Sequence, residues 1–218
     1  MSEIDIAQIF IAFVVLLFSL TVHESAHAWT ADRLGDPTAR LLGRVSLNPV
    51  VHADLFGTVI FPLISMVSGF PLIGWAKPVP VNVGRLRHGR RDFMLVAAAG
   101  PASNLLIAVA AAVVLFVLAL LPAMLLSLDV QQPLRQMFAR AMVVNVMLAV
   151  FNMIPIPPLD GGNVLSGLLP LSAARVYDGI RPYGIVLLYG LMFSGMFDSI
   201  VVTPTLFILG LLGFGPSA

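Results

Sequence analysis

The chain has 218 residues, 59% of them hydrophobic and only 11% charged, and its formal net charge is +1. Ordinary soluble domains are about 45–50% apolar and about 25% charged, so this composition excludes a soluble globular enzyme and a disordered chain. The small net charge excludes a nucleic-acid-binding surface, and the absence of cysteine excludes disulfides and thiolate metal ligands. We therefore predict an all-α polytopic membrane protein in which residues 1–218 form a single domain.

The first apolar run, residues 4–29, is long enough to cross a bilayer. Its leader carries two acidic residues and no basic one, which is unlike a cleaved export signal. Arginines follow the run, so the positive-inside rule places the start of the chain outside and residues 30–54 in the cytoplasm.

The second apolar run, residues 55–75, is interrupted by several glycines and prolines. The loop after it holds the largest basic cluster of the chain: Lys77, Arg85, Arg87, Arg90 and Arg91. If this run crossed the membrane, two basic loops would lie on opposite sides, against the positive-inside rule. We therefore predict a re-entrant segment, which enters and leaves at the same face.

The stretch from Gly74 to Val83 (GWAKPVPVNV) alternates apolar residues with prolines. Proline lacks a backbone N–H, so this pattern predicts an edge strand and not a helix. An edge strand can pair with a second peptide in extended form. The sequence thus predicts a small β element after the first span.

The rest of the chain contains four further apolar runs: residues 93–126, 137–154, 182–197 and 199–214. The helix of the first of these is predicted to begin near Pro101, and the last two runs are short and joined by a turn at Asp198. The expected fold is a helical bundle of about five to six membrane segments. With the second run re-entrant, the loops 30–54, 74–92 and 155–181 all lie in the cytoplasm.

Three ionisable residues within the first run, His23, Glu24 and His27, form an H-E-x-x-H pattern. Residues four apart share one face of a helix, so both imidazoles can bind one metal ion. Zinc suits imidazole and lowers the pKa of bound water to about 7. Glu24 lies about 100° round the helix from His23, where it can take a proton from that water. The alternative, three groups satisfying one another in a bundle, would bury Glu24 without a cation at a high cost.

A zinc site of this kind needs a third protein ligand, and Asp160 is the best candidate. It follows a span end broken by prolines and precedes Gly161 and Gly162, a setting that would hold a carboxylate rigidly at membrane depth. The structural alternative is that Asp160 is the N-cap of the next helix. The H-E-x-x-H pattern elsewhere in the chain favours the metal ligand.

HESAH in the first run and NMIPIPPLDGG after a later one resemble the motifs of the site-2 protease family of intramembrane zinc metalloproteases. The second motif of that family, N-x-x-P-x-P-x-x-D-G, is matched by Asn152, Pro155, Pro157, Asp160 and Gly161. GPASN, residues 100–104, is similar to a further family motif, so the resemblance extends from about residue 7 to residue 165. The stretches GRVSLNPVVHADLFGT and GWAKPVPVN resemble the short prokaryotic branch, without a PDZ or CBS domain.

The resemblance implies that His23, His27 and Asp160 bind Zn²⁺, that Glu24 is the general base, and that Asn152 holds the substrate or the oxyanion. It implies hydrolysis of peptide bonds within or next to transmembrane segments of membrane-protein substrates, that is, regulated intramembrane proteolysis. The expected location is a prokaryotic plasma membrane, with a multi-pass chain and the active site towards the cytoplasmic side.

Two other functions are compatible with the same residues. A membrane metal-binding protein or transporter would use histidines and carboxylates as a permeation site. An inactive homologue would only bind transmembrane helices. Glu24 discriminates between them, because only the enzyme needs a carboxylate that is not itself a ligand.

Four further polar residues can be interpreted from the sequence. His52 and Asp54 can form a pair behind the metal ligands, supply a fourth ligand, or cap a turn, and the turn is the favoured interpretation. Asn104 and Asn145 lie in apolar helices, where hydrogen bonding between helices is the ordinary role of asparagine.

Overall fold

The structure is a computed structural model that describes residues 6–69, 74–120 and 127–214. Its α-helices are α1 (Ile6–Arg33), α2 (Thr38–Leu41), α3 (Phe61–Ser68), α4 (Arg90–Leu120), α5 (Leu128–Asn152), α6 (Asp160–Leu168), α7 (Leu171–Asp178), α8 (Gly184–Phe193) and α9 (Thr203–Leu211). Short 3₁₀ turns are η1 (Pro49–Val51), η3 (Val83–Arg85) and η4 (Arg181–Tyr183), and π-helical turns are η2 (Leu55–Ile60) and η5 (Asp198–Val202).

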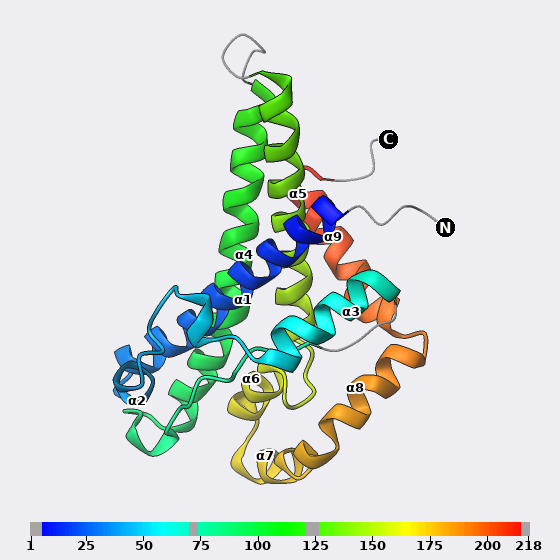
Figure 1. Cartoon of the computed structure of the whole chain (residues 1–218). Coiled ribbons are helices and arrows are strands. Elements are labelled where there is room, and N and C mark those ends of the chain that lie inside the picture. The colour runs from blue at the N-terminus through cyan, green and yellow to red at the C-terminus, as the bar shows by residue number, and fades with distance from the viewer. Residues whose placement is uncertain (1–5, 70–73, 121–126, 215–218) are drawn as a thin grey trace.

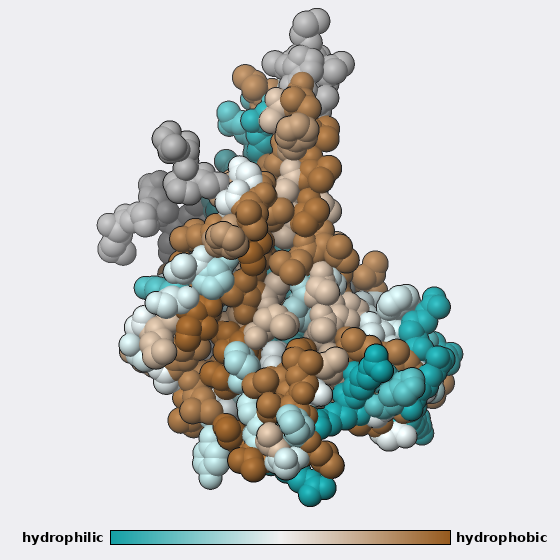
Figure 2. Space-filling model, turned by 180° about the vertical axis from the view of Figure 1, so that it is seen from behind, coloured by the Kyte–Doolittle hydropathy of each residue, from teal (hydrophilic) through white to brown (hydrophobic). Residues whose placement is uncertain are grey.

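The helices α1, α4 and α5 form the centre of the molecule (Figure 1). The antiparallel pair α4 and α5 extends well beyond α1, and its contact contains small residues such as Ala108 and Ala111, which let the helices approach closely. Met142 and Val146 of α5 fill the space between them and α9. The pair is mostly covered by hydrophobic side chains, whereas hydrophilic ones gather near α2 and the start of α4 (Figure 2).

Three described helices, α1, α4 and α5, are each long and apolar enough to cross a membrane. A fourth span is possible if the bent pair of residues 171–193 and 198–211, which meet at 93°, counts as one. The described residues thus contain three to four candidate spans, besides the shorter apolar helix of residues 55–68 that belongs to the predicted re-entrant run. The helices α8 and α9 have 10 and 9 residues, too few at 1.5 Å per residue to cross about 30 Å of hydrocarbon separately.

The second apolar run forms one short helical segment, η2 followed directly by α3, which ends at Gly69 in the left-handed conformation (φ 69°). The chain then returns to the start of this segment, because the Trp75 N–H donates to the Gly57 carbonyl over 3.0 Å. The Trp75 ring also packs edge-on against Phe61, with 5.3 Å between the centroids. Trp75, at the end of this apolar run, thus lies beside Gly57 near its start, as a re-entrant segment requires.

The predicted small β element is wrong, because residues 74–83 form no strand and none occurs elsewhere in the described ranges. The N–H groups of Trp75 and Lys77 donate inward to the carbonyls of Gly57 and His52. Pro78 and Pro80 have no N–H to offer. This segment is therefore extended backbone without a ladder, and pairing of a substrate with its edge is not supported.

The predicted start of the third span near Pro101 is also wrong. The helix α4 begins at Arg90 and continues through Pro101. Asp92, buried in the first turn, accepts a hydrogen bond from the His88 N–H over 2.8 Å and so stabilises the earlier start.

Candidate metal centre

His23 and His27 lie one turn apart on α1, where this helix packs against α4 (Figure 1). Asp160 is the first residue of α6, and α6 also packs against α4. The Oδ2 atom of Asp160 lies 3.1 Å from Nε2 of His23 and 3.4 Å from Nε2 of His27. The two Nε2 atoms are 3.1 Å apart. The structure thus brings Asp160 to the two histidines, which precede it by 133 and 137 residues in the chain.

The other ring nitrogen of each histidine has its own partner on α4. Nδ1 of His27 lies 2.7 Å from the Val96 carbonyl oxygen, and a carbonyl can only accept, so this nitrogen carries the proton. Nδ1 of His23 lies 2.6 Å from Oδ1 of Asn104. With the protons on Nδ1, both Nε2 atoms direct lone pairs at the carboxylate.

In the neutral form of both rings, which is the form that binds a metal, three electron-pair donors therefore converge with no proton between them. Oδ2 of Asp160 is buried and makes no hydrogen bond of acceptable geometry. Such an arrangement is repulsive unless a cation lies among the donors. A tetrahedral zinc ion with bonds of about 2.0–2.1 Å separates its ligand atoms by about 3.3–3.4 Å, close to the three distances observed. The residues present fit zinc.

Comparison with protein families matches residues 11–138 and 127–192 to the model described as "Peptidase family M50". The chain belongs to peptidase family M50. M50 peptidases depend on zinc, which agrees with the donor set of the cluster. Together with the apolar helices, this membership makes the chain a membrane zinc metallopeptidase.

Curated relatives of this M50 peptidase carry the same kind of name. "Putative zinc metalloprotease YwhC" of Bacillus subtilis is 36% identical over 195 residues, which cover 88% of this chain and 84% of the relative. "Putative zinc metalloprotease Rip2" is 28% identical in Mycolicibacterium smegmatis and 30% identical in Mycobacterium tuberculosis. These matches cover 82% and 79% of this chain, and 64% and 62% of the relatives. No solved structure matches the chain significantly.

The candidate ligands on α1 are positioned by the close approach of α4. A Cβ at Gly100 would lie 2.5 Å from Nε2 and Cε1 of His27 and 2.6 Å from Cε1 of His23, so only glycine lets α4 reach the imidazoles. Asp160 is held by the proline segment before it, where Tyr177 Oη donates to the Pro155 carbonyl over 2.9 Å. The N-cap of α6 is Leu159, and Asp160 makes no capping hydrogen bond, so the structural alternative for Asp160 is not observed.

The two other candidate site residues are placed close by in the chain but outside the cluster. Glu24 is half-buried beside His23 on α1, and its carboxylate has no hydrogen-bond partner in the part of the chain that the structure describes. Asn152 is the last residue of α5 and donates from Nδ2 to the Leu148 carbonyl over 3.0 Å.

The remaining polar residues follow the structural interpretations. Asp54 caps η2, since its Oδ1 accepts from the N–H groups of Phe56 and Gly57, which confirms the turn. His52 is buried and its Nε2 lies 2.9 Å from the Ser46 carbonyl oxygen, so it fastens the same loop. The hydrogen bond from Asn104 to Asn145, over 2.8 Å, confirms the predicted contact between helices.

Three features of the site were not predicted from the sequence. They are the close approach of α4 to the histidines at Gly100, the contact of His27 with the Val96 carbonyl, and the hydrogen bond of Ser19 to Asn145. Gly100 was visible only as part of GPASN, and a backbone carbonyl leaves no trace in the sequence.

Proposed function

We propose that this M50 peptidase hydrolyses peptide bonds within or next to transmembrane segments, with zinc held by His23, His27 and Asp160. The observation that carries the proposal is the convergence of three possible metal-ligand atoms at the contact between α1 and α4, both of them long enough to span the membrane. A site built into spanning helices is accessible to peptide bonds at membrane depth.

The bound zinc would supply a Lewis acid and a water that ionises near neutral pH. Glu24 follows His23 directly on α1, and its half-buried carboxylate makes no hydrogen bond to the residues that the structure describes, so it can hydrogen-bond the attacking water. In this role it accepts the proton of the water and donates it to the amine nitrogen of the leaving fragment. The histidines and Asp160 hold the ion, and their fixed orientations keep the reacting atoms in place.

Asn152 is the proposed substrate-binding residue. It stands at the end of α5, where the proline segment that carries Asp160 begins. Its Nδ2 has two N–H groups, of which one is directed at the Leu148 carbonyl. The second N–H can donate to the carbonyl oxygen of the scissile bond, where negative charge develops during attack.

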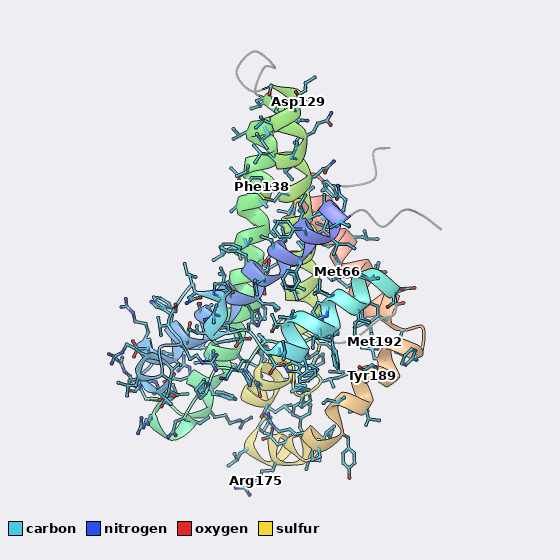
Figure 3. All side chains as sticks on the ribbon, in the orientation of Figure 1. Met66, Asp129, Phe138, Arg175, Tyr189 and Met192 are labelled. Carbon is cyan, nitrogen blue, oxygen red and sulfur yellow. The ribbon has the colours of Figure 1, made fainter. Side chains whose placement is uncertain are left out.

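We further propose that water reaches the site from the cytoplasmic side. The three loops that the charge rule assigns to the cytoplasm lie at one end of the molecule, as α7, labelled by Arg175, and the distant Asp129 illustrate (Figure 3). Hydrogen bonds join them: Arg87 N–H to Leu34 O, Asn82 N–H to Asp36 Oδ2, and Arg90 Nη2 to Leu169 O. Asp160 begins α6, which lies towards the same end of the molecule (Figure 1). We therefore expect water to reach the metal site from that end.

The test combines zinc content with cleavage of a panel of transmembrane peptides in detergent or liposomes. Glu24→Gln is expected to keep about one zinc per chain and to lose cleavage by a factor of about 100 or more, because a general base contributes about 10²–10⁴-fold. Asp32→Asn is the matched control, since Asp32 lies on the same helix and pairs with Arg40 over 2.9 Å. Cleavage by Glu24→Gln at the wild-type rate would refute the proposed enzymatic function of this site. Zinc binding with no cleavage by the wild type would favour transport or an inactive homologue.

A further inference from the structure

The hydrogen bond between His23 and Asn104 continues to Asn145 on α5 and from there back to Ser19 on α1. Nδ2 of Asn104 donates to Oδ1 of Asn145 over 2.8 Å, and Nδ2 of Asn145 donates to Oγ of Ser19 over 2.8 Å. Ser19 in turn donates to the Val15 carbonyl over 2.7 Å. Asn104, Asn145 and Ser19 are each 0% exposed, so no solvent competes for these bonds. The chain of bonds connects α1, α4 and α5 behind one candidate zinc ligand.

The structure determines which atom donates and which accepts in each hydrogen bond of this series. The amide of Asn145 has a second bond, from Nδ2 to the Ala141 carbonyl over 2.7 Å, and that carbonyl can only accept. The amide therefore cannot rotate by 180°, since its Oδ1 would then face the Ala141 oxygen. Oδ1 of Asn145 must face Asn104, so Asn104 must present Nδ2 to Asn145 and Oδ1 to His23.

This order of donors and acceptors continues to the imidazole of His23. Because Oδ1 of Asn104 can only accept, Nδ1 of His23 must carry the ring proton. Nε2 of His23 then offers its lone pair to the site, on the same side as Asp160. His27 obtains the same tautomer from the Val96 backbone carbonyl, which cannot reverse its polarity. The side-chain amide of Asn104, by contrast, can reverse unless other groups hold it. Its Nδ2 donates to Oδ1 of Asn145 over 2.8 Å, whereas the Ser19 carbonyl, at 3.5 Å from the same nitrogen, is a much weaker acceptor.

We propose that Asn145, together with Ser19, is a positioning residue that holds the Asn104 amide in the orientation that keeps the lone pair of His23 Nε2 on the zinc. The inference rests on the zinc centre of the proposed function. Asn145 touches neither His23 nor any other predicted ligand, so its effect on zinc must pass through Asn104. Removal of such an outer partner lowers metal affinity by about 10- to 100-fold.

The experiment measures Zn²⁺ affinity by chelator competition on purified full-length protein in detergent, without any peptide. Asn145→Leu is expected to weaken zinc binding about 10-fold. Asn104→Asp is expected to retain zinc, because a carboxylate accepts from His23 in either orientation and needs no partner to orient it. In the Asn104→Asp background, Asn145→Leu is then expected to have no further effect on affinity.

The double substitution separates orientation from packing. If Asn145 acted only by packing, its loss would weaken zinc binding equally in both backgrounds, and that result would overturn the proposal. Ser19→Ala provides a milder variant should Asn145→Leu fail to fold, with an expected loss of several-fold. Thr21→Val is its control: Thr21 is buried on the same helix and donates to the Leu17 carbonyl, but has no place in the chain of bonds. Equal zinc affinities for these two variants would contradict the inference.

A second measurement follows the ring proton itself. In ¹⁵N-histidine-labelled protein freed of metal, the His23 proton is expected on Nδ1 in the wild type and distributed over both nitrogens in Asn145→Leu. An unchanged tautomer in that variant would overturn the proposal. Neither readout involves proteolysis, so failure to cleave any peptide would refute the proposed function while these results still decide the role of Asn145.

Discussion

Replacing Gly100 with alanine tests how closely α4 must approach the two histidines of α1. The added Cβ would lie 2.5 Å from His27 and 2.6 Å from His23, whereas ordinary contacts begin at 3.4 Å. One side must therefore move by roughly 0.9 Å. Val96 and Asn104, which hold the two imidazoles, lie one turn before and after Gly100 on the same face of α4. Moving α4 outward would stretch both of those hydrogen bonds.

The strain of such overpacking is about 1–3 kcal/mol. Without metal the imidazoles can rotate away from the methyl group, but zinc requires them in place, so the strain falls on the bound state. At about 1.4 kcal/mol per factor of ten, zinc affinity should decrease between about 5-fold and about 150-fold. Chelator competition measures the affinity, and thermal unfolding of the metal-free protein shows that the fold is retained.

The matched control for Gly100→Ala is Gly190→Ala in α8, where nothing lies within 4 Å of the added Cβ. That variant should bind zinc as the wild type does. It can gain up to about 1 kcal/mol of stability, because alanine favours the helix over glycine. A zinc affinity of Gly100→Ala within twofold of the wild type would refute the close approach of α4 to the histidines.

Three further outcomes are expected. Asp160→Asn should lower zinc affinity at least 10-fold, because it removes a charged ligand atom, and zinc titration checks this. The variant should stay folded, because the substitution also removes the repulsion between the carboxylate and the imidazole lone pairs in the metal-free protein. Burial alone would raise the pKa of Asp36, but hydrogen bonds from the Thr38 side chain and from the N–H groups of Asn82 and Thr38 hold that pKa below its usual value. Its stabilising effect is then fully present above about pH 4 and lost as the pH falls through the folded-state pKa, so Asp36→Asn should reduce thermal stability at pH 7 and by progressively less as the pH falls below about 4. Gly184→Ala should destabilise α8 against the proline segment by about 1–3 kcal/mol, since its Cβ would overlap the Pro157 carbonyl, and thermal unfolding measures the loss.

The two histidines of the candidate site could be assigned from the sequence because a single helix positions them. The spacing of four in HESAH places both imidazoles on one face whatever surrounds α1. Asp160 was a weaker inference, since its local sequence suited an N-cap equally well and only the H-E-x-x-H pattern elsewhere favoured the metal ligand. The structure places its Oδ2 3.1 Å from Nε2 of His23. Asn104 and Asn145 were recognised as polar residues in apolar helices, but their partners depended on packing.

The wrong predictions share one cause, which is that local patterns were used where tertiary contacts decide. The alternating prolines of residues 74–83 do favour extended backbone, but the described residues contain no strand with which this segment could pair. The N–H groups of Trp75 and Lys77 donate instead to the carbonyls of Gly57 and His52. Pro101 is a frequent helix start, yet here it lies inside α4, because Asp92 stabilises an earlier first turn. The two last apolar runs are hydrophobic enough for spans, but their helices are short and meet at 93°.

Composition and periodicity were thus sufficient for the membrane class, the helical fold and the chemical nature of the metal ligands, because these depend on residue types and on the repeat of one helix. They could not show that Oδ2 of Asp160 and two imidazole lone pairs meet within 3.4 Å, or which nitrogen of His23 carries the proton. Those features require α1, α4, α5 and α6 to be packed together, with a glycine at the closest approach and a buried amide held by a carbonyl one turn away.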